Sequence, residues 1–206
     1  MSGYDIFEML RQTKKAETLV NNFEIKQVLP CFTTPGYIRF IAQADREIGD
    51  VIPIIFLKFP PGKSTYIREE NTLTLRAFNR MITFHPSGKV AVTNTRDEEE
   101  AKEILEEIRK IINDAYKDYL KNGKPKESDI EAAEKLSWTD IYAYLPKTNC
   151  GKCGYQVCSA FAASLIQGET KLSKCTPLKE PVNSNNLKTL KQKLGACLLQ
   201  ALGWTE

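Results

Sequence analysis

The chain has 206 residues, of which 42% are hydrophobic and 27% charged, and its formal net charge at pH 7 is +3. This length allows one large or two small domains with enough apolar residues for a core, and the charge is too modest to indicate nucleic acid by itself. The longest apolar run, VIPIIFL at 51–57, is far shorter than the ~20 residues that a membrane span needs. We therefore expect no membrane span.

The first half of the chain combines a short helix with β-rich runs. Apolar residues on one face predict a helix over residues 4–19. Prolines and glycines then separate β-rich runs at 25–32, 37–44, 51–59, 73–79, 81–86 and 89–95. The last two runs predict a hairpin that turns at Ser87–Gly88 and directs one set of alternating side chains to a common face: Ile82, Phe84, Val90 and Val92. Residues 60–64 (PPGKS) lack the leading glycine of a phosphate loop, which indicates a turn.

A long helix is predicted over residues 97–121. Acidic residues begin it at the positive end of its dipole, an apolar stripe follows, and Gly123 and Pro125 end it. An antiparallel sheet with one long amphipathic helix packed on it is an α+β architecture. The polar segment 121–126 is the expected boundary between an α+β domain at 1–124 and a small helical domain at 125–206.

Residues 82–105 carry a hairpin motif, Phe84, Ser87, Gly88, Lys89 and Thr93, followed by a Glu-Ala-rich helix. This segment resembles one repeat of the TATA-box-binding protein fold. DNA-binding members of that family carry two tandem repeats, whereas this chain shows one, and it shows neither intercalating aromatics nor a basic surface. Nucleic acid is therefore not an expected partner. The resemblance implies that the sheet could pair with a second copy to form a homodimer, or dock another protein or a ligand.

Short helices are predicted in the second part of the chain, residues 125–206. A capping-box pattern at Ser128–Glu131 predicts a helix to residue 136, and a short apolar turn is expected at 138–145. Further helices are predicted at 159–168, ending at Gly168, and at 187–202. The stripe of the last helix contains Leu187, Leu190, Leu194, Cys197, Leu198 and Leu202.

Residues outside this region give weaker functional signals. Cys31 and Cys197 are expected to be buried apolar side chains, and His85 is expected to be a surface turn residue. The sequence contains no Ser-His-Asp set, phosphate loop or dinucleotide fingerprint. We therefore do not expect the chain to be catalytic alone.

The chemistry is concentrated in residues 145–178, which hold four of the six cysteines with the spacing Cys-x2-Cys-x4-Cys-x16-Cys: Cys150, Cys153, Cys158 and Cys175. A tetrahedral zinc site usually presents two close pairs, and here only one exists. Disulfides would suit a secreted protein, but the N-terminus shows no signal-peptide core. A cubane iron-sulfur cluster accepts one close pair, a third ligand nearby and a distant fourth, so it is favoured, with zinc and disulfides as alternatives.

A second resemblance rests on several features of residues 136–178. They are the lead-in Ile141, Tyr142, Leu145 and Pro146, the cysteine segment, an Ala-rich helix with Phe161 and Ala162, Gly168, and the ending Cys175-x-Pro-Leu. Residues 136–178, about a fifth of the chain, resemble the small 4Fe-4S module of the large subunit of the corrinoid iron-sulfur protein of the acetyl-CoA pathway. They are also similar to the module of the B subunit of Rnf electron-transport complexes. The resemblance implies Cys150, Cys153, Cys158 and Cys175 as cluster ligands. Because 31 residues follow Cys175, we do not expect this chain to house a corrinoid as that protein does.

The expected function is low-potential one-electron transfer, in a reducing cytoplasm, to a redox partner such as a corrinoid or one-carbon enzyme of anaerobic metabolism. Backbone amides of Gly151, Lys152, Gly154 and Tyr155 are expected to point at sulfur and tune the potential. Lysines at 147, 152, 171 and 174 would compensate cluster charge or steer an acidic partner. The alternatives are a partner- or nucleic-acid-binding protein with a structural or sensory cluster or zinc, and a non-catalytic subunit of a larger enzyme.

Overall fold

The computed structural model describes residues 18–32 and 34–204, so residues 4–17 of the predicted N-terminal helix lie outside the described residues. The chain divides into two compact units. Of the described residues, the first unit contains those up to 55 together with 66–124, and the second contains 56–65 together with those from 125 to 204. The short segment 56–65 thus groups with the C-terminal part of the sequence.

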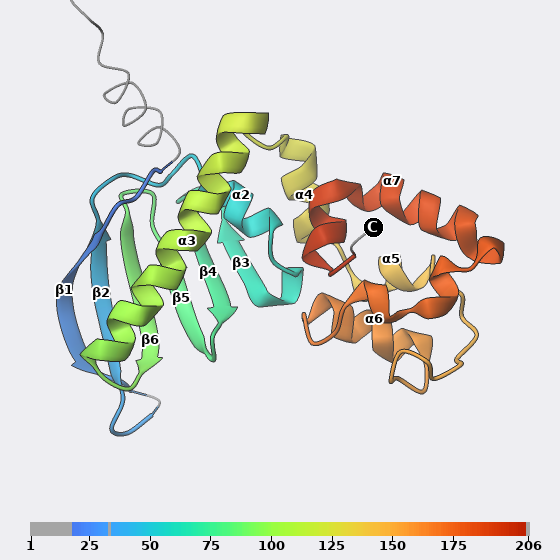
Figure 1. Cartoon of the computed structure of the whole chain (residues 1–206), viewed down its shortest axis with the longest axis horizontal. Helices are drawn as coiled ribbons and strands as arrows, with labels where there is room; N and C mark the ends of the chain where they lie inside the picture. The colour runs from blue at the N-terminus through green and yellow to red at the C-terminus, as the bar shows by residue number, and fades with distance from the viewer. Residues whose placement is uncertain (1–17, 33, 205–206) are drawn as a thin grey trace, which may run out of the picture. The chain divides into compact units, whose positions relative to one another are not determined.

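A six-stranded antiparallel sheet has the order β1-β2-β6-β5-β4-β3 (Figure 1). Its strands are β1 (Phe23–Pro30), β2 (Ile38–Ala44), β3 (Ser64–Ile67), β4 (Thr72–Ala77), β5 (Arg80–Phe84) and β6 (Lys89–Thr95). The predicted hairpin is confirmed as β5 and β6, in which Ile82 pairs with Val92 and Phe84 with Val90. These four side chains are buried, as their alternation predicts.

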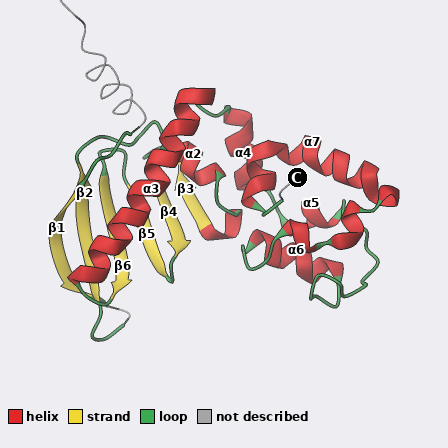
Figure 2. Cartoon of the chain, viewed as in Figure 1, coloured by secondary structure: helices red, strands yellow, loops and turns green. Residues whose placement is uncertain are grey.

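Helix α3 (Glu98–Asn122) crosses one face of the sheet (Figure 2). Asp97 caps it by accepting a hydrogen bond from the backbone N–H of Glu100 at 2.8 Å, and Gly123 ends it with a φ of 75°. Its buried stripe, which includes Ile104, Ile108 and Ile112, packs toward the core. The sheet, this helix and the helical C-terminal region confirm the α+β prediction.

The strand predicted at 51–59 is wrong, because the structure places helix α2 (Ile52–Leu57) there. All but one of its residues are buried. An apolar run buried on nearly every side has no periodicity that separates a strand from a helix. The sequence also missed β3, which begins directly after a short 3₁₀ turn at Pro61–Lys63.

The C-terminal region contains α4 (Glu127–Lys135), α5 (Trp138–Tyr142), α6 (Cys158–Ile166) and α7 (Ser184–Ala201). The capping box expected at Ser128 is wrong, since Lys126 occupies the N-cap of α4 without a side-chain hydrogen bond. The structure instead has a capping box at α5, where the carboxylate of Asp140 accepts the backbone N–H of Ser137 at 2.9 Å. That carboxyl has a lowered pKa, first because of the hydrogen bond from the Ser137 hydroxyl.

Helix α7 is interrupted at Gly195, whose φ is 69°. Its stripe is buried at Leu190, Leu194 and Leu198. Beyond the interruption Leu202 is buried as well, but Cys197 is exposed. The prediction that Cys197 is buried is therefore wrong, and Cys31 is only half-buried.

Candidate metal centre

The loop between α5 and α6 carries the first two cysteines of the predicted site. Its backbone has positive φ at Lys147 (57°), Asn149 (47°), Gly151 (71°) and Gly154 (91°). The N–H of Gly154 donates to the carbonyl of Gly151 at 2.9 Å, which closes a tight turn around Cys153. Nothing lies within 4 Å of a Cβ placed at either glycine, so left-handed backbone conformation and not crowding makes glycine suitable there.

Asn149 connects this loop to α6. Its side-chain oxygen accepts a hydrogen bond from the backbone N–H of Cys158 at 2.9 Å. That N–H lies in the first turn of α6, where no backbone carbonyl is available to accept it. The rings of Tyr155 and Phe161 also contact each other, with centroids 5.6 Å apart. The third cysteine is therefore held against the loop that carries the first two.

Cys175 lies between two 3₁₀ turns, Leu172–Lys174 and Thr176–Lys179. Its side chain is 5% exposed, and that of Cys158 is 8% exposed. Cys153 is half-buried, whereas Cys150 is exposed. The predicted ligands thus range from a buried pair to one cysteine at the surface.

The environments of Cys150 and Cys175 shift their thiol pKa values in opposite directions. The pKa of Cys150 is lowered, first by the backbone N–H of Lys152 and then by the Thr148 hydroxyl. Burial raises the pKa of Cys175, and negative charge on Cys153, Cys158 and Cys150 raises it further, while the backbone N–H of Leu178 opposes the rise. The charges of the other three thiols therefore influence the pKa of Cys175.

The donor chemistry of these thiols fits an iron-sulfur cluster. The four cysteines form no disulfide, and the backbone N–H of Lys152 acts on the Cys150 sulfur, as in proteins that tune such clusters. Within the described residues, however, no three or more His, Cys, Asp or Glu side chains are arranged to hold a metal ion. The assignment of Cys150, Cys153, Cys158 and Cys175 as ligands therefore stays a prediction.

Only part of the hydrogen bonding at the cysteines was predicted. The expected amide of Lys152 does reach Cys150, but that of Gly154 bonds to the Gly151 carbonyl instead. The contribution of Asn149, whose side-chain oxygen accepts the N–H of Cys158, was missed. Asn149 lies nine residues before Cys158, while Val157 occupies the N-cap of α6, so no local capping pattern in the sequence reveals this bond.

Comparison with known families identifies the class of this segment. Residues 145–177 match a family model described as "Putative Fe-S cluster". The matched residues include all four cysteines: Cys150, Cys153, Cys158 and the more distant Cys175. The C-terminal part of the chain therefore contains an Fe-S cluster domain, and an iron-sulfur cofactor is supported.

Curated relatives that match include gamma subunits of acetyl-CoA decarbonylase/synthase complexes from several organisms. The acetyl-CoA decarbonylase/synthase complex subunit gamma of Methanocaldococcus jannaschii is 46% identical over 57 residues, which cover 28% of this chain and 12% of the relative. Subunit gamma 1 of that complex from Methanosarcina thermophila is 54% identical over 39 residues, or 19% of this chain and 8% of the relative. The similarity is thus confined to a small part of each relative.

No solved structure matches the chain, so the resemblance of the sheet unit to a TATA-box-binding protein repeat stays a prediction. None of the helices in the described part of the chain combines the length and apolar content that crossing a membrane would require.

Proposed function

We propose that residues 125–206 form a domain that holds a 4Fe-4S cluster on Cys150, Cys153, Cys158 and Cys175. The observation that carries this proposal is the match of residues 145–177 to an Fe-S cluster family, because the matched segment contains all four cysteines. One close pair, a third cysteine soon after and a distant fourth is a spacing that suits a cubane cluster. The N–H of Lys152 at the Cys150 sulfur adds support.

The proposed role of the domain is low-potential electron transfer to a protein partner. When bound, such a cluster supplies reversible one-electron chemistry. Burial of Cys158 and Cys175 would exclude water from one side of the site, while the exposed Cys150 leaves another side accessible to a partner. Lys147 and Lys152 are exposed on the same loop and would attract an acidic partner surface.

The proposed partner is an enzyme of anaerobic one-carbon metabolism, with a corrinoid protein as the specific candidate. The support is that the relatives are gamma subunits of acetyl-CoA decarbonylase/synthase complexes, together with the resemblance of residues 136–178 to corrinoid iron-sulfur protein and Rnf modules. In this role the chain is an electron carrier or accessory subunit in a reducing cytoplasm, and it is not catalytic alone.

Anaerobic purification with iron and zinc analysis, followed by EPR before and after dithionite, tests the cofactor and its redox role together. We expect about four irons per chain and a signal that appears on reduction. One zinc per chain and no EPR signal would instead indicate that the segment binds zinc and has a purely structural role. Four irons that are reduced neither by dithionite nor by the stronger reductant Ti(III) citrate would retain the cluster but overturn electron transfer.

Single Cys→Ser variants test the ligands. Substitution of Cys150, Cys153, Cys158 or Cys175 should lower the iron content and change the EPR spectrum. Cys197→Ser is the matched control, because Cys197 is exposed and lies outside the matched segment. Full iron content and an unchanged spectrum in Cys175→Ser would refute that ligand assignment.

A further inference from the structure

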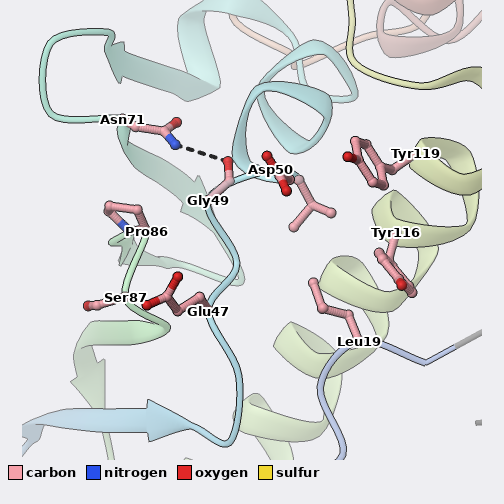
Figure 3. A pocket seen from close by; sticks show the side chains of 10 residues that line it. Leu19, Glu47, Gly49, Asp50, Asn71, Pro86, Ser87, Tyr116 and Tyr119 are labelled. Atoms are coloured by element: carbon pink, nitrogen blue, oxygen red, sulfur yellow. Dashed lines mark hydrogen bonds between the residues drawn. The ribbon is translucent and has the colours of Figure 1, made fainter. Parts of the chain in front are cut away.

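The first unit contains a pocket of about 420 Å³ between α3, the loop at 47–51 and the hairpin turn at Pro86–Ser87 (Figure 3). This volume lies within the range of roughly 300–1,000 Å³ found for small-molecule sites. All of its walls come from the first unit, whereas the Fe-S segment belongs to the second. Any ligand of this pocket would therefore define a site separate from the cluster.

Hydrogen bonds hold the loop side of the pocket in place. The side-chain amide of Asn71 donates to the carbonyl of Gly49 at 2.9 Å, as the dashed line in Figure 3 shows, and the Tyr66 hydroxyl donates to Asn71 Oδ1 at 2.9 Å. The N–H of Ile48 donates to the carbonyl of Pro86, also at 2.9 Å. A wall fixed in this way is organised before a ligand arrives, which reduces the entropic cost of binding.

The opposite wall is fixed to α3. The buried amide of Asn113 accepts hydrogen bonds from the N–H groups of Leu19 and Val20, at 3.0 and 2.9 Å, and donates to the carbonyl of Val20 at 2.8 Å. These bonds place Leu19 beside Tyr116 on the helix side of the pocket (Figure 3). The Tyr116 and Tyr119 rings are stacked, with centroids 6.2 Å apart. The helix side is thus apolar and aromatic.

The charge of the pocket is negative. Glu47 and Asp50 line it, and no Lys, Arg or His is among its lining residues. Asp50 has a partner, since Lys124 Nζ lies 2.7 Å from its carboxylate. Glu47 forms no hydrogen bond or ion pair with any residue that the structure describes. Among the described residues the Glu47 carboxylate thus has no positively charged partner; it lies beside Ser87, and the tyrosine rings are on the opposite wall of the pocket (Figure 3).

We propose that this pocket binds a small organic ammonium ion, with its charge near Glu47 and its apolar body against the Tyr116 side. Carboxylates attract an ammonium group by charge, and aromatic faces attract it through the ring quadrupole. A bare divalent cation fits less well: Ca²⁺ takes about six to eight oxygen ligands, and the described residues contain no group of three or more metal-ligating side chains. An anionic ligand would be repelled by Glu47.

The test is calorimetric titration of the full chain with choline and with 3,3-dimethylbutan-1-ol, its uncharged carbon isostere. We expect saturable choline binding, with the neutral alcohol bound at least about tenfold more weakly. Glu47→Gln keeps the shape of the side chain but removes its charge, so it should weaken choline binding about tenfold and leave the alcohol unaffected.

Glu99→Gln is the matched control, because Glu99 is an exposed carboxylate in the first turn of α3 and does not line the pocket. It should bind choline as the parent chain does. Thermal unfolding of both variants should match that of the parent chain, since both carboxylates are exposed. No saturable choline binding, equal affinity for the neutral alcohol, or an unchanged affinity in Glu47→Gln would each overturn the proposal.

Discussion

The side-chain oxygen of Asn149 accepts the backbone N–H of Cys158 at 2.9 Å, and this bond holds a cysteine-bearing loop against the helix that follows it. The residue has a φ of 47°, a conformation that Asn tolerates better than most residues. Its position thus combines a helix cap with a left-handed turn. Both contributions are separable by substitution.

We predict that Asn149→Ala lowers the free energy of unfolding by about 1–3 kcal/mol, because it removes a cap and places a Cβ residue without a local hydrogen bond in a left-handed conformation. Asn149→Gly should cost less, since glycine accepts this backbone conformation and only the cap is lost. Asn149→Asp keeps the acceptor and should restore most of the stability. Chemical denaturation monitored by circular dichroism measures the series, and equal stability of the Ala and parent chains would refute the cap.

Alkylation of the cluster-free protein should separate the cysteines by exposure. We predict that iodoacetamide modifies Cys150 at least about tenfold faster than Cys158 or Cys175, because Cys150 is exposed and the other two are almost fully buried. Mass spectrometry of timed samples measures the rates. In denaturant the three rates should converge, and slow modification of Cys150 in the folded protein would contradict its position at the surface.

Local signals in the sequence were sufficient for the hairpin and for the cysteine segment. Residues 82 and 92 alternate with their neighbours, and the Ser87–Gly88 turn fixes their register across β5 and β6. The cysteine spacing likewise lies within one continuous segment, and the family match covers the same residues. In both cases the informative residues are close together in the chain, so no knowledge of the tertiary fold was needed.

Features that depend on distant segments were not predicted. The sequence predicts a strand at 51–59, because an apolar run buried on nearly every side has no readable period, but residues 52–57 form α2. The predicted stripe of α7 runs to Leu202 and includes Cys197, because sequence alone does not reveal that Gly195 leaves the helical conformation; Leu198 and Leu202 are buried, but Cys197 is exposed. The pocket beside Glu47 and Tyr116 forms only when a loop approaches a distant helix. Such features require the three-dimensional fold.

Two glycines with the same backbone preference should respond very differently to substitution. Gly88 has a φ of 84° and Gly36 a φ of 82°, but a Cβ at Gly88 would overlap the carbonyl oxygen of Arg46, whereas nothing lies within 4 Å of one at Gly36. We predict that Gly36→Ala costs about 1–2 kcal/mol, the strain of the left-handed conformation alone. Gly88→Ala should cost about 1–3 kcal/mol more, because the overlap forces the backbone to shift. Denaturant titration of both variants measures the difference, and similar losses would contradict the close approach of the β5–β6 turn to Arg46.

The pairing of Arg80 with Glu100 predicts how stability depends on pH. Arg80 extends from β5, and its guanidinium lies 3.2 Å from the Glu100 carboxylate of α3, with the two side chains only 10% and 17% exposed. The pKa of Glu100 is lowered from its ordinary value of 4.5, first by the hydrogen bond from the backbone N–H of Arg96 and also by the charges of Arg80 and Arg96. Because the folded-state pKa lies below the unfolded one, this carboxylate stabilises the fold above pH 4.5 and loses that contribution as the pH falls through the lowered value.

We therefore predict that Glu100→Gln is less stable than the parent chain at pH 7 by roughly 1 kcal/mol, and that this difference shrinks once the pH falls below 4.5. Glu99→Gln, a change to an exposed carboxylate of the same helical turn, should show a smaller difference at pH 7. Denaturant titrations at a series of pH values between 7 and about 3 measure both variants, since linkage acts on the free energy of unfolding. If the Glu100→Gln difference grew on acidification, the folded-state pKa of Glu100 would have to lie above the unfolded one. The hydrogen bond from Arg96 and the ion pair that connects β5 to α3 could then not be what stabilises this carboxylate.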